Sequence, residues 1–253
     1  MPRPDMNSIP LPTAAVLTGR DDNFIDHERL ERPVHRDMVA AWQALAEDAR
    51  AAGFELAIAS GYRDYFRQLE IWNQKAAGIR PVFDAHGVAL DLAVLDDWDK
   101  AQAILRWSAL PGASRHHWGT DVDVYDRAAV ATDYRVQLTV EESADAGPFG
   151  ALHRWLDERI DAGRAHGFFR PYACDRGGIA PERWHLSYAP LAATYQRQLK
   201  AATLFTALDV EALALRAVIR ARWQTIFERF IWVPAESYPV ALRERLQGME
   251  AAS

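Results

Sequence analysis

The chain has 253 residues, 49% of them hydrophobic, and a formal net charge of -6. This length is sufficient for one sizeable core, and the acidic balance argues against a nucleic-acid partner. No apolar run approaches the roughly 20 residues of a membrane span, so we expect no membrane partner either. The single cysteine, Cys174, cannot form an intramolecular disulfide, which is consistent with a reducing compartment.

The chain divides into three predicted segments. Residues 1–33 are rich in proline and predict an irregular segment that lies over the rest of the protein. They carry early charges and no apolar stretch typical of a secretory signal, from which we expect a cytoplasmic protein. We place one catalytic domain at residues 34–195 and a helical C-terminal extension, packed on it, at residues 196–253.

Helices and strands alternate along the first part of the catalytic domain. Apolar side chains recur at helical spacing over residues 38–49, and residues 54–58 alternate as a strand. A second helix is predicted over residues 65–77, so Arg63 lies at a strand-to-helix junction. Residues 88–107 are helix-prone but mixed, and residues 151–166 predict an amphipathic helix.

Two later strands carry the residues of chemical interest. Residues 121–125 alternate between polar and apolar types, which predicts a strand with Asp121 and Asp123 on its polar face. Gly119 permits a tight bend that brings His116 back toward Asp123. Residues 184–188 alternate in the same way and place His185 on one face.

Two imidazoles and one carboxylate match zinc sites that leave a fourth position open. The three residues are His116, Asp123 and His185, and Glu182 lies just outside the second strand, where a carboxylate is placed to act as a base. His117 is the rival to His116 as a ligand. Spacing alone does not separate the two histidines, and we favour His116.

The motifs resemble a known family. The string Ser114-x-His116-x-x-Gly119-x-x-x-Asp123, followed by Glu182-x-Trp184-His185, is similar to the zinc-dependent D-alanyl-D-alanine carboxypeptidases and dipeptidases, whose clan includes lysostaphin-type peptidases and hedgehog domains. Upstream, Ser60-Gly61-Tyr62-Arg63 with Gln68 resembles the arginine motif of that family. The resemblance covers about residues 35–195.

The resemblance implies roles for individual residues. His116, Asp123 and His185 would bind zinc, Glu182 would be the general base, and Arg63 would polarise the scissile carbonyl. We assign Ser114, Gln68, Asp121 and Tyr62 to the substrate site. Asp121 departs from the family pattern, because many relatives carry a small apolar residue there. It is therefore a candidate either for supporting the metal ligands or for contacting the amino group of a diaminopimelate side chain.

We expect an α+β fold with a small, mostly antiparallel sheet flanked by helices and zinc bound at the sheet. The expected activity is removal of a C-terminal D-alanine from peptidoglycan stem peptides or other D-Ala-containing peptides. A cytoplasmic location favours an L,D-carboxypeptidase that trims recovered tetrapeptides. The alternatives are a D,D-carboxypeptidase or D-Ala-D-Ala dipeptidase, and a non-catalytic binding module with structural zinc.

Overall fold

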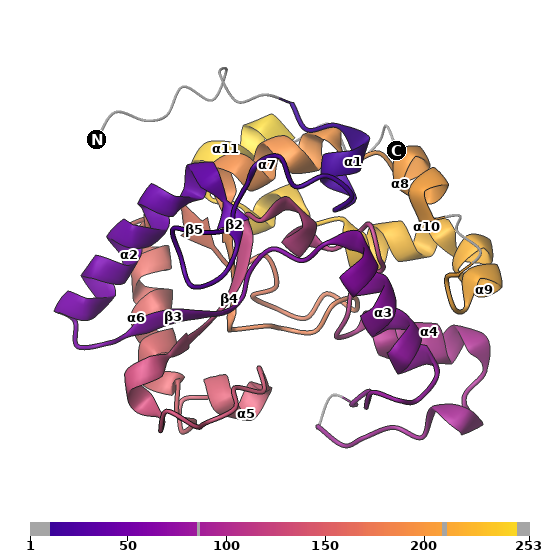
Figure 1. Ribbon diagram of the computed structural model, residues 1–253, viewed down its shortest axis with the longest axis horizontal. Coiled ribbons are helices and arrows are strands. Elements are labelled where there is room, and N and C mark those ends of the chain that lie inside the picture. The colour runs from indigo at the N-terminus through magenta and orange to yellow at the C-terminus, as the bar shows by residue number, and fades with distance from the viewer. Residues whose placement is uncertain (1–10, 85–86, 209–211, 247–253) are drawn as a thin grey trace.

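A four-stranded antiparallel sheet lies at the centre of the computed structural model, which describes residues 11–84, 87–208 and 212–246 (Figure 1). The strands follow the order β3 (Leu56–Ser60), β4 (Asp121–Asp126), β6 (His185–Tyr188), β5 (Phe168–Phe169). All neighbouring strands are antiparallel. Helices surround this sheet, which confirms the predicted α+β class.

The alternating sequences of β4 and β6 give the sheet one apolar and one polar face. Val122, Val124 and Leu186 are fully buried on the apolar side. On the polar side the register pairs Asp123 with His185 across the two strands. Residues directly opposite in an antiparallel pair lie close together, so the pairing brings two of the predicted metal ligands to one place.

Two long helices cover the apolar face. These are α2 (Val39–Ala51) and α6 (Gly150–Asp161). Trp42 and Leu45 of α2 and Leu152 of α6 share a hydrophobic cluster with the apolar residues of β4 and β6. The observed α6 ends five residues before the predicted end at residue 166.

Helix α3 (Tyr65–Ala76) begins directly after the arginine motif. Asp64 caps its N-terminus by accepting a hydrogen bond from the backbone N–H of Arg67 at 2.8 Å. This cap fixes the strand-to-helix junction at which Arg63 was predicted. The following mixed region contains α4 (Asp97–Leu105) and a short 3₁₀ helix, so helix occupies only part of the 88–107 range.

The C-terminal third of the chain is helical. Its elements are α7 (Ala189–Gln198), α8 (Ala201–Leu208), α9 (Arg216–Ala221), α10 (Trp223–Ile226), a π-helical turn (Phe227–Ile231) and α11 (Val240–Leu246). Phe227 and Phe230 are buried in one cluster with Trp72 of α3 and Leu105 of α4. The described part of the extension is thus packed on the catalytic domain, and α7 spans the predicted boundary.

The N-terminal segment is not wholly irregular. It contains α1 (Ala14–Leu17) and β1 (Ile25–Asp26), and β1 pairs with β2 (Val34–His35). Residues 1–10 of the predicted segment lie outside the described residues.

The remaining short elements are α5 (Val140–Ser143) and the 3₁₀ helices Arg36–Met38, Leu92–Val94, Arg115–Trp118, Arg127–Ala129 and Ala235–Ser237. Across the described ranges, no helix is long and apolar enough to cross a membrane.

Candidate active site

The three predicted metal ligands form one cluster on the polar face of the sheet. Ligand atoms of His116, Asp123 and His185 all lie within 4.8 Å of one another, and all three residues are buried. His116 Nε2 is 3.4 Å from Asp123 Oδ2, and His185 Nδ1 is 3.3 Å from Asp123 Oδ1. The donor set of two imidazoles and a carboxylate suits a tetrahedral zinc site with one open position.

A left-handed glycine creates the bend that returns His116 to the sheet. The 3₁₀ helix Arg115–Trp118 ends at Gly119, whose φ is +66°. A Cβ atom at Gly119 would lie 2.5 Å from Ile25 Cδ1 and 2.7 Å from the backbone nitrogen of His35. Conformation and space both require glycine here. The bend predicted from the sequence is therefore confirmed.

The imidazoles are oriented by their second nitrogens. His116 Nδ1 is 2.9 Å from the carbonyl oxygen of Gly61, and His185 Nε2 is 2.9 Å from Asp121 Oδ1. Because both partners are acceptors, these nitrogens donate, which leaves His116 Nε2 and His185 Nδ1 as the ring nitrogens that face Asp123 and that would bind a metal ion once deprotonated. Such contacts are typical of histidine ligands in metal sites. The residues present therefore fit a zinc ion.

His117 binds backbone groups of the protein with both of its ring nitrogens. Its Nδ1 donates to the backbone carbonyl of Arg63 at 2.6 Å, and its Nε2 accepts from the N–H of Gly112 at 2.9 Å. Burial lowers the pKa of His117 to about 3, which keeps the ring neutral. Both ring nitrogens are used, so the structure supports His116, and not its neighbour, as the ligand.

Glu182 and Arg63 lie beside the metal cluster. Glu182 Oε2 is 3.3 Å from His185 Nδ1, and the Glu182 side chain retains 13% exposure. Burial lowers the pKa of Arg63, while the charges of Asp123 and Glu182 oppose that shift. For Asp123, burial alone would raise the pKa, but the facing imidazoles lower it well below its usual range. A carboxylate and a cation thus flank the cluster.

Gln68 supports Arg63 and is not open to a substrate. Arg63 Nη1 donates to Gln68 Oε1 at 2.9 Å, and Nη2 donates to Ser60 Oγ at 3.0 Å. Gln68 is fully buried, and its amide nitrogen donates to the carbonyl of Ala109 at 2.7 Å. Since both ends of the side chain are used within the protein, its assignment as a substrate-binding residue is corrected to one that holds Arg63.

Asp121 is also not in a substrate pocket. It has no exposed surface and accepts hydrogen bonds from His185, from Thr120 Oγ1 at 2.7 Å and from Arg115 Nε at 2.9 Å. A buried carboxylate paired in this way cannot meet a substrate amino group. The interpretation as a support of the metal ligands is the one that the contacts favour, and the diaminopimelate hypothesis is wrong.

The other two substrate-site assignments have different outcomes. Ser114 is buried beside His116 and makes no side-chain capping bond to the 3₁₀ helix that it precedes, so its hydroxyl is not a cap and its substrate role stays a prediction. Tyr62 packs its ring edge-on against His27 and directs its hydroxyl to the carbonyl of Gly19 at 3.5 Å. These contacts are with the N-terminal segment and do not support a substrate role for Tyr62.

Sequence reasoning missed three nearby residues. The ring of Tyr172 lies edge-on to His185 with centroids 5.0 Å apart, and Arg115 is buried next to Asp121. Burial lowers the pKa of Lys75 to about 8; the charge of Glu182 opposes this shift and the charge of Arg63 adds to it. Arg115 lies inside the zinc motif, so a charged residue at this position could have indicated a role at the site. Tyr172 and Lys75 lie in segments that carry no motif.

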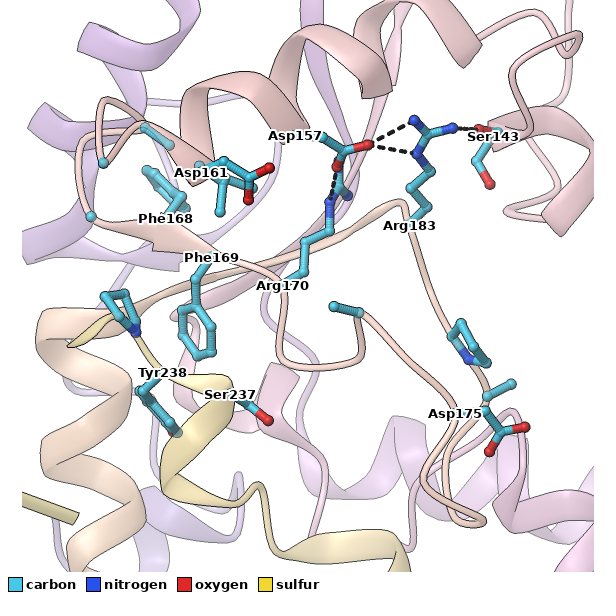
Figure 2. A pocket seen from close by; sticks show the side chains of 18 of the residues that line it. Ser143, Asp157, Asp161, Phe168, Phe169, Arg170, Asp175, Arg183, Ser237 and Tyr238 are labelled. Atoms are coloured by element: carbon cyan, nitrogen blue, oxygen red, sulfur yellow. Dashed lines mark hydrogen bonds and ion pairs between the residues drawn. The ribbon is translucent and has the colours of Figure 1, made fainter. Parts of the chain in front are cut away.

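A cavity of about 1220 Å³ is lined in part by Pro181 and Arg183, the two neighbours of Glu182 in the sequence, and none of the metal-cluster residues lines it (Figure 2). In Figure 2, Asp157 of α6 lies between the guanidinium groups of Arg170 and Arg183. Asp157 Oδ2 accepts from Arg183 Nη2 at 2.7 Å, and Oδ1 accepts from Arg170 Nε at 2.8 Å. Arg183 directly follows Glu182, so this pair of contacts anchors the loop that carries Glu182 to α6.

The sequence matches the VanY family of D-alanyl-D-alanine carboxypeptidases over residues 31–191, well over half of the chain. The chain belongs to this family. An uncharacterized protein of Haemophilus influenzae is 58% identical over 72 residues, which are 28% of this chain and 49% of that protein. A D-alanyl-D-alanine carboxypeptidase of Enterococcus faecalis is 32% identical over 154 residues, which are 60% of this chain and 46% of the enterococcal protein. The chain thus spans about half the length of each of these two relatives.

A solved structure also matches this chain. The vancomycin resistance D,D-pentapeptidase VanY from a VanB-type cassette, in complex with Zn(II), is 24% identical, with a TM-score of 0.47. The match covers 79% of this chain and 92% of that one.

Proposed function

We propose that this protein is a zinc metallo-carboxypeptidase that removes a C-terminal D-alanine from peptidoglycan-derived peptides. The observation that carries the proposal is the cluster of His116, Asp123 and His185 with Glu182 Oε2 only 3.3 Å from His185 Nδ1. A structural zinc site needs neither a partly exposed carboxylate nor an adjacent guanidinium. The presence of Glu182 and Arg63 therefore argues against a non-catalytic binding module.

The residues around the cluster have different roles in peptide hydrolysis. A zinc ion held by the three ligands would supply Lewis acidity for the scissile carbonyl and for the attacking water. Glu182 accepts the proton of that water and returns it to the leaving amine, as a general base and then a general acid. Arg63 offers a fixed positive charge to the developing oxyanion, and one such donor typically contributes about 2.7 to 4 kcal/mol.

The charges near Glu182 suit a peptide with a free carboxylate end. Arg63, Lys75 and Arg80 carry positive charges that act on one another in this region, and burial lowers the pKa of Lys75 to about 8. A partly buried cluster of like charges is stabilised when an anionic group binds among them. This favours a carboxypeptidase, whose substrate presents a terminal carboxylate, over an endopeptidase.

For the substrate, the proposal favours an L,D-carboxypeptidase that trims tetrapeptides in the cytoplasm. Removal of D-alanine from recovered tetrapeptides there is compatible with cell-wall synthesis, whereas trimming pentapeptide precursors would deplete its supply. The second candidate is a D,D-carboxypeptidase, which the name of the matching family favours. Cell fractionation with an antibody to the protein would test the compartment.

The deciding experiment compares muramyl tetrapeptide and pentapeptide as substrates of the purified, zinc-loaded protein, with products identified by mass spectrometry. Tetrapeptide converted to tripeptide supports the L,D assignment, and pentapeptide converted to tetrapeptide replaces it with the D,D assignment. A chelator-treated sample and Glu182→Gln are the controls. Turnover of neither peptide by the loaded wild-type protein contradicts the proposal.

A further inference from the structure

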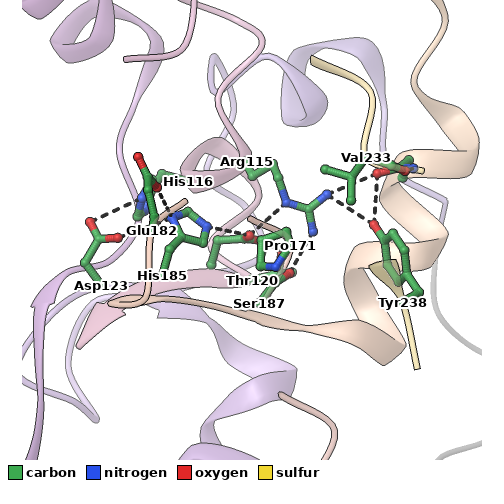
Figure 3. Close-up of polar contacts among 12 residues, drawn as sticks. Arg115, His116, Thr120, Asp123, Pro171, Glu182, His185, Ser187, Val233 and Tyr238 are labelled. Atoms are coloured by element: carbon green, nitrogen blue, oxygen red, sulfur yellow. Dashed lines mark hydrogen bonds and ion pairs between the residues drawn. The ribbon is translucent and has the colours of Figure 1, made fainter. Parts of the chain in front are cut away.

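A buried row of polar side chains leads from the metal cluster to the C-terminal segment (Figure 3). It starts at His185, whose Nδ1 faces Asp123 and whose Nε2 donates to Asp121 Oδ1 at 2.9 Å. The acceptor at Nε2 decides which ring nitrogen carries the proton and in which plane the ring lies. Asp121 therefore controls how His185 is presented to a metal ion.

Asp121 is neutralised by Arg115. The two side chains are 0% and 3% exposed, and Arg115 Nε donates to Asp121 Oδ1 at 2.9 Å. A buried carboxylate without a counter-ion would add a negative charge next to Asp123 and Glu182 and would be costly to desolvate. The ion pair removes that charge, so Asp121 orients His185 without changing the charge balance of the metal cluster.

Arg115 is in turn held at its other two nitrogens. Nη2 donates to Ser187 Oγ at 2.7 Å, and Nη1 donates to Gln196 Oε1 and to the Tyr238 hydroxyl, both at 3.1 Å. The guanidinium is planar and rigid, so fixing its far edge also fixes the direction of Nε toward Asp121. Tyr238 is 123 residues away from Arg115 in the sequence.

The outer end of the row belongs to the C-terminal extension. The Tyr238 hydroxyl donates to Gln196 Oε1 at 2.9 Å, and the Gln196 amide donates to the carbonyl of Val233. Tyr238 is 1% exposed and packs its ring against Phe169 of β5, with centroids 4.5 Å apart. The last group of the row is thus itself immobilised by packing.

We propose that Arg115, Gln196 and Tyr238 are positioning residues of the metal centre, which act on His185 through Asp121. The C-terminal extension is then part of the metal site and not only a cover for the hydrophobic core. The inference rests on the proposed function only in requiring that a divalent metal binds. It explains why this chain carries an aspartate at position 121 together with an arginine six residues earlier.

The test measures metal binding directly. Zinc affinity is determined by competition with a chromogenic chelator, and the ligand geometry is followed by the visible absorption bands of the cobalt(II)-substituted protein. Tyr238→Phe removes only the hydroxyl that accepts from Arg115, and we expect roughly fivefold weaker zinc binding, because the loss of this hydrogen bond reaches the metal only through Arg115 and Asp121. For Asp121→Asn we expect about 10- to 100-fold weaker binding. Both variants should shift the cobalt bands.

Tyr195→Phe is the matched control. Tyr195 is also 1% exposed, and its hydroxyl is bonded to His35 Nε2 at 3.0 Å, which is not a member of the row. We expect a similar loss of thermal stability but unchanged zinc affinity and cobalt bands. Equal zinc affinities in Tyr238→Phe and Tyr195→Phe would overturn the inference, even if Asp121→Asn fails to fold. Normal zinc binding without peptide turnover would instead contradict the proposed function alone.

Discussion

Replacing Gln68 by leucine tests whether this residue acts through Arg63 or by touching the substrate. The change retains the approximate volume and removes the 2.9 Å acceptor of Arg63 Nη1, leaving Ser60 Oγ at 3.0 Å as the other side-chain partner. A hydrogen bond to a charged group contributes about 1.5 to 3 kcal/mol. We expect kcat/KM to fall about 10- to 100-fold, or about 1.4 to 2.7 kcal/mol. Complete loss of the Arg63 charge should cost more, about 2.7 to 4 kcal/mol.

The assay is a double-mutant cycle on kcat/KM for D-alanine release, with Gln68→Leu, Arg63→Met and the double variant. If Gln68 acts only through Arg63, the double variant has the same kcat/KM as Arg63→Met. Additive losses would refute this reasoning and would restore Gln68 to the substrate site. Thermal melts accompany each variant, because the carbonyl of Ala109 loses its 2.7 Å donor in Gln68→Leu.

Three further outcomes are expected. Glu182→Gln should lower kcat/KM by about 10²- to 10⁴-fold while zinc remains bound, measured by metal analysis after dialysis; loss of the metal would instead make Glu182 a ligand. Removing zinc with a chelator should abolish activity and lower Tm, and added zinc should restore both; a Tm insensitive to the chelator would contradict binding at the His116, Asp123 and His185 cluster. Burial lowers the pKa of His153 to about 3, so below about pH 6.5 the unfolded chain binds a proton that the folded protein does not. The free energy of unfolding that depends on neutral His153 is therefore complete above about pH 6.5 and is lost as the pH falls toward 3, by at most about 1.4 kcal/mol per pH unit. Urea unfolding at pH 7 and pH 5 should show a smaller pH effect in His153→Leu; an equal pH effect would assign the acid sensitivity to other groups.

The clustering of His116, Asp123 and His185 could be predicted because it depends on local patterns. Strand periodicity placed Asp123 and His185 on polar faces, and a glycine at position 119 predicted the bend that returns His116 to the cluster. Each of these inferences involves residues close together in sequence or a well-known donor set. The apolar face of β4 was predictable for the same reason, because alternation decides which side chains are buried.

The wrong assignments concern residues whose partners come from distant segments. Alternation put Asp121 on the same face as Asp123, but it did not reveal that Arg115 and His185 donate to that carboxylate. The motif placed Gln68 near Arg63, but only the fold shows that Ala109 takes its amide. A polar residue in a site motif can therefore contact either the substrate or other residues of the site, and long-range contacts decide between the two.

The paired histidines of the zinc motif hold both backbone polar groups of one distant residue. The carbonyl of His116 accepts from the N–H of Arg63 at 3.1 Å, and the ring of His117 donates to the Arg63 carbonyl at 2.6 Å. The first histidine makes its contact through the main chain, so an engineer who exchanges that side chain to alter metal preference leaves the contact in place. The second makes it through the ring, so any exchange there removes a contact that fixes the backbone of Arg63. The motif consequently offers metal engineering one adjustable histidine, not two.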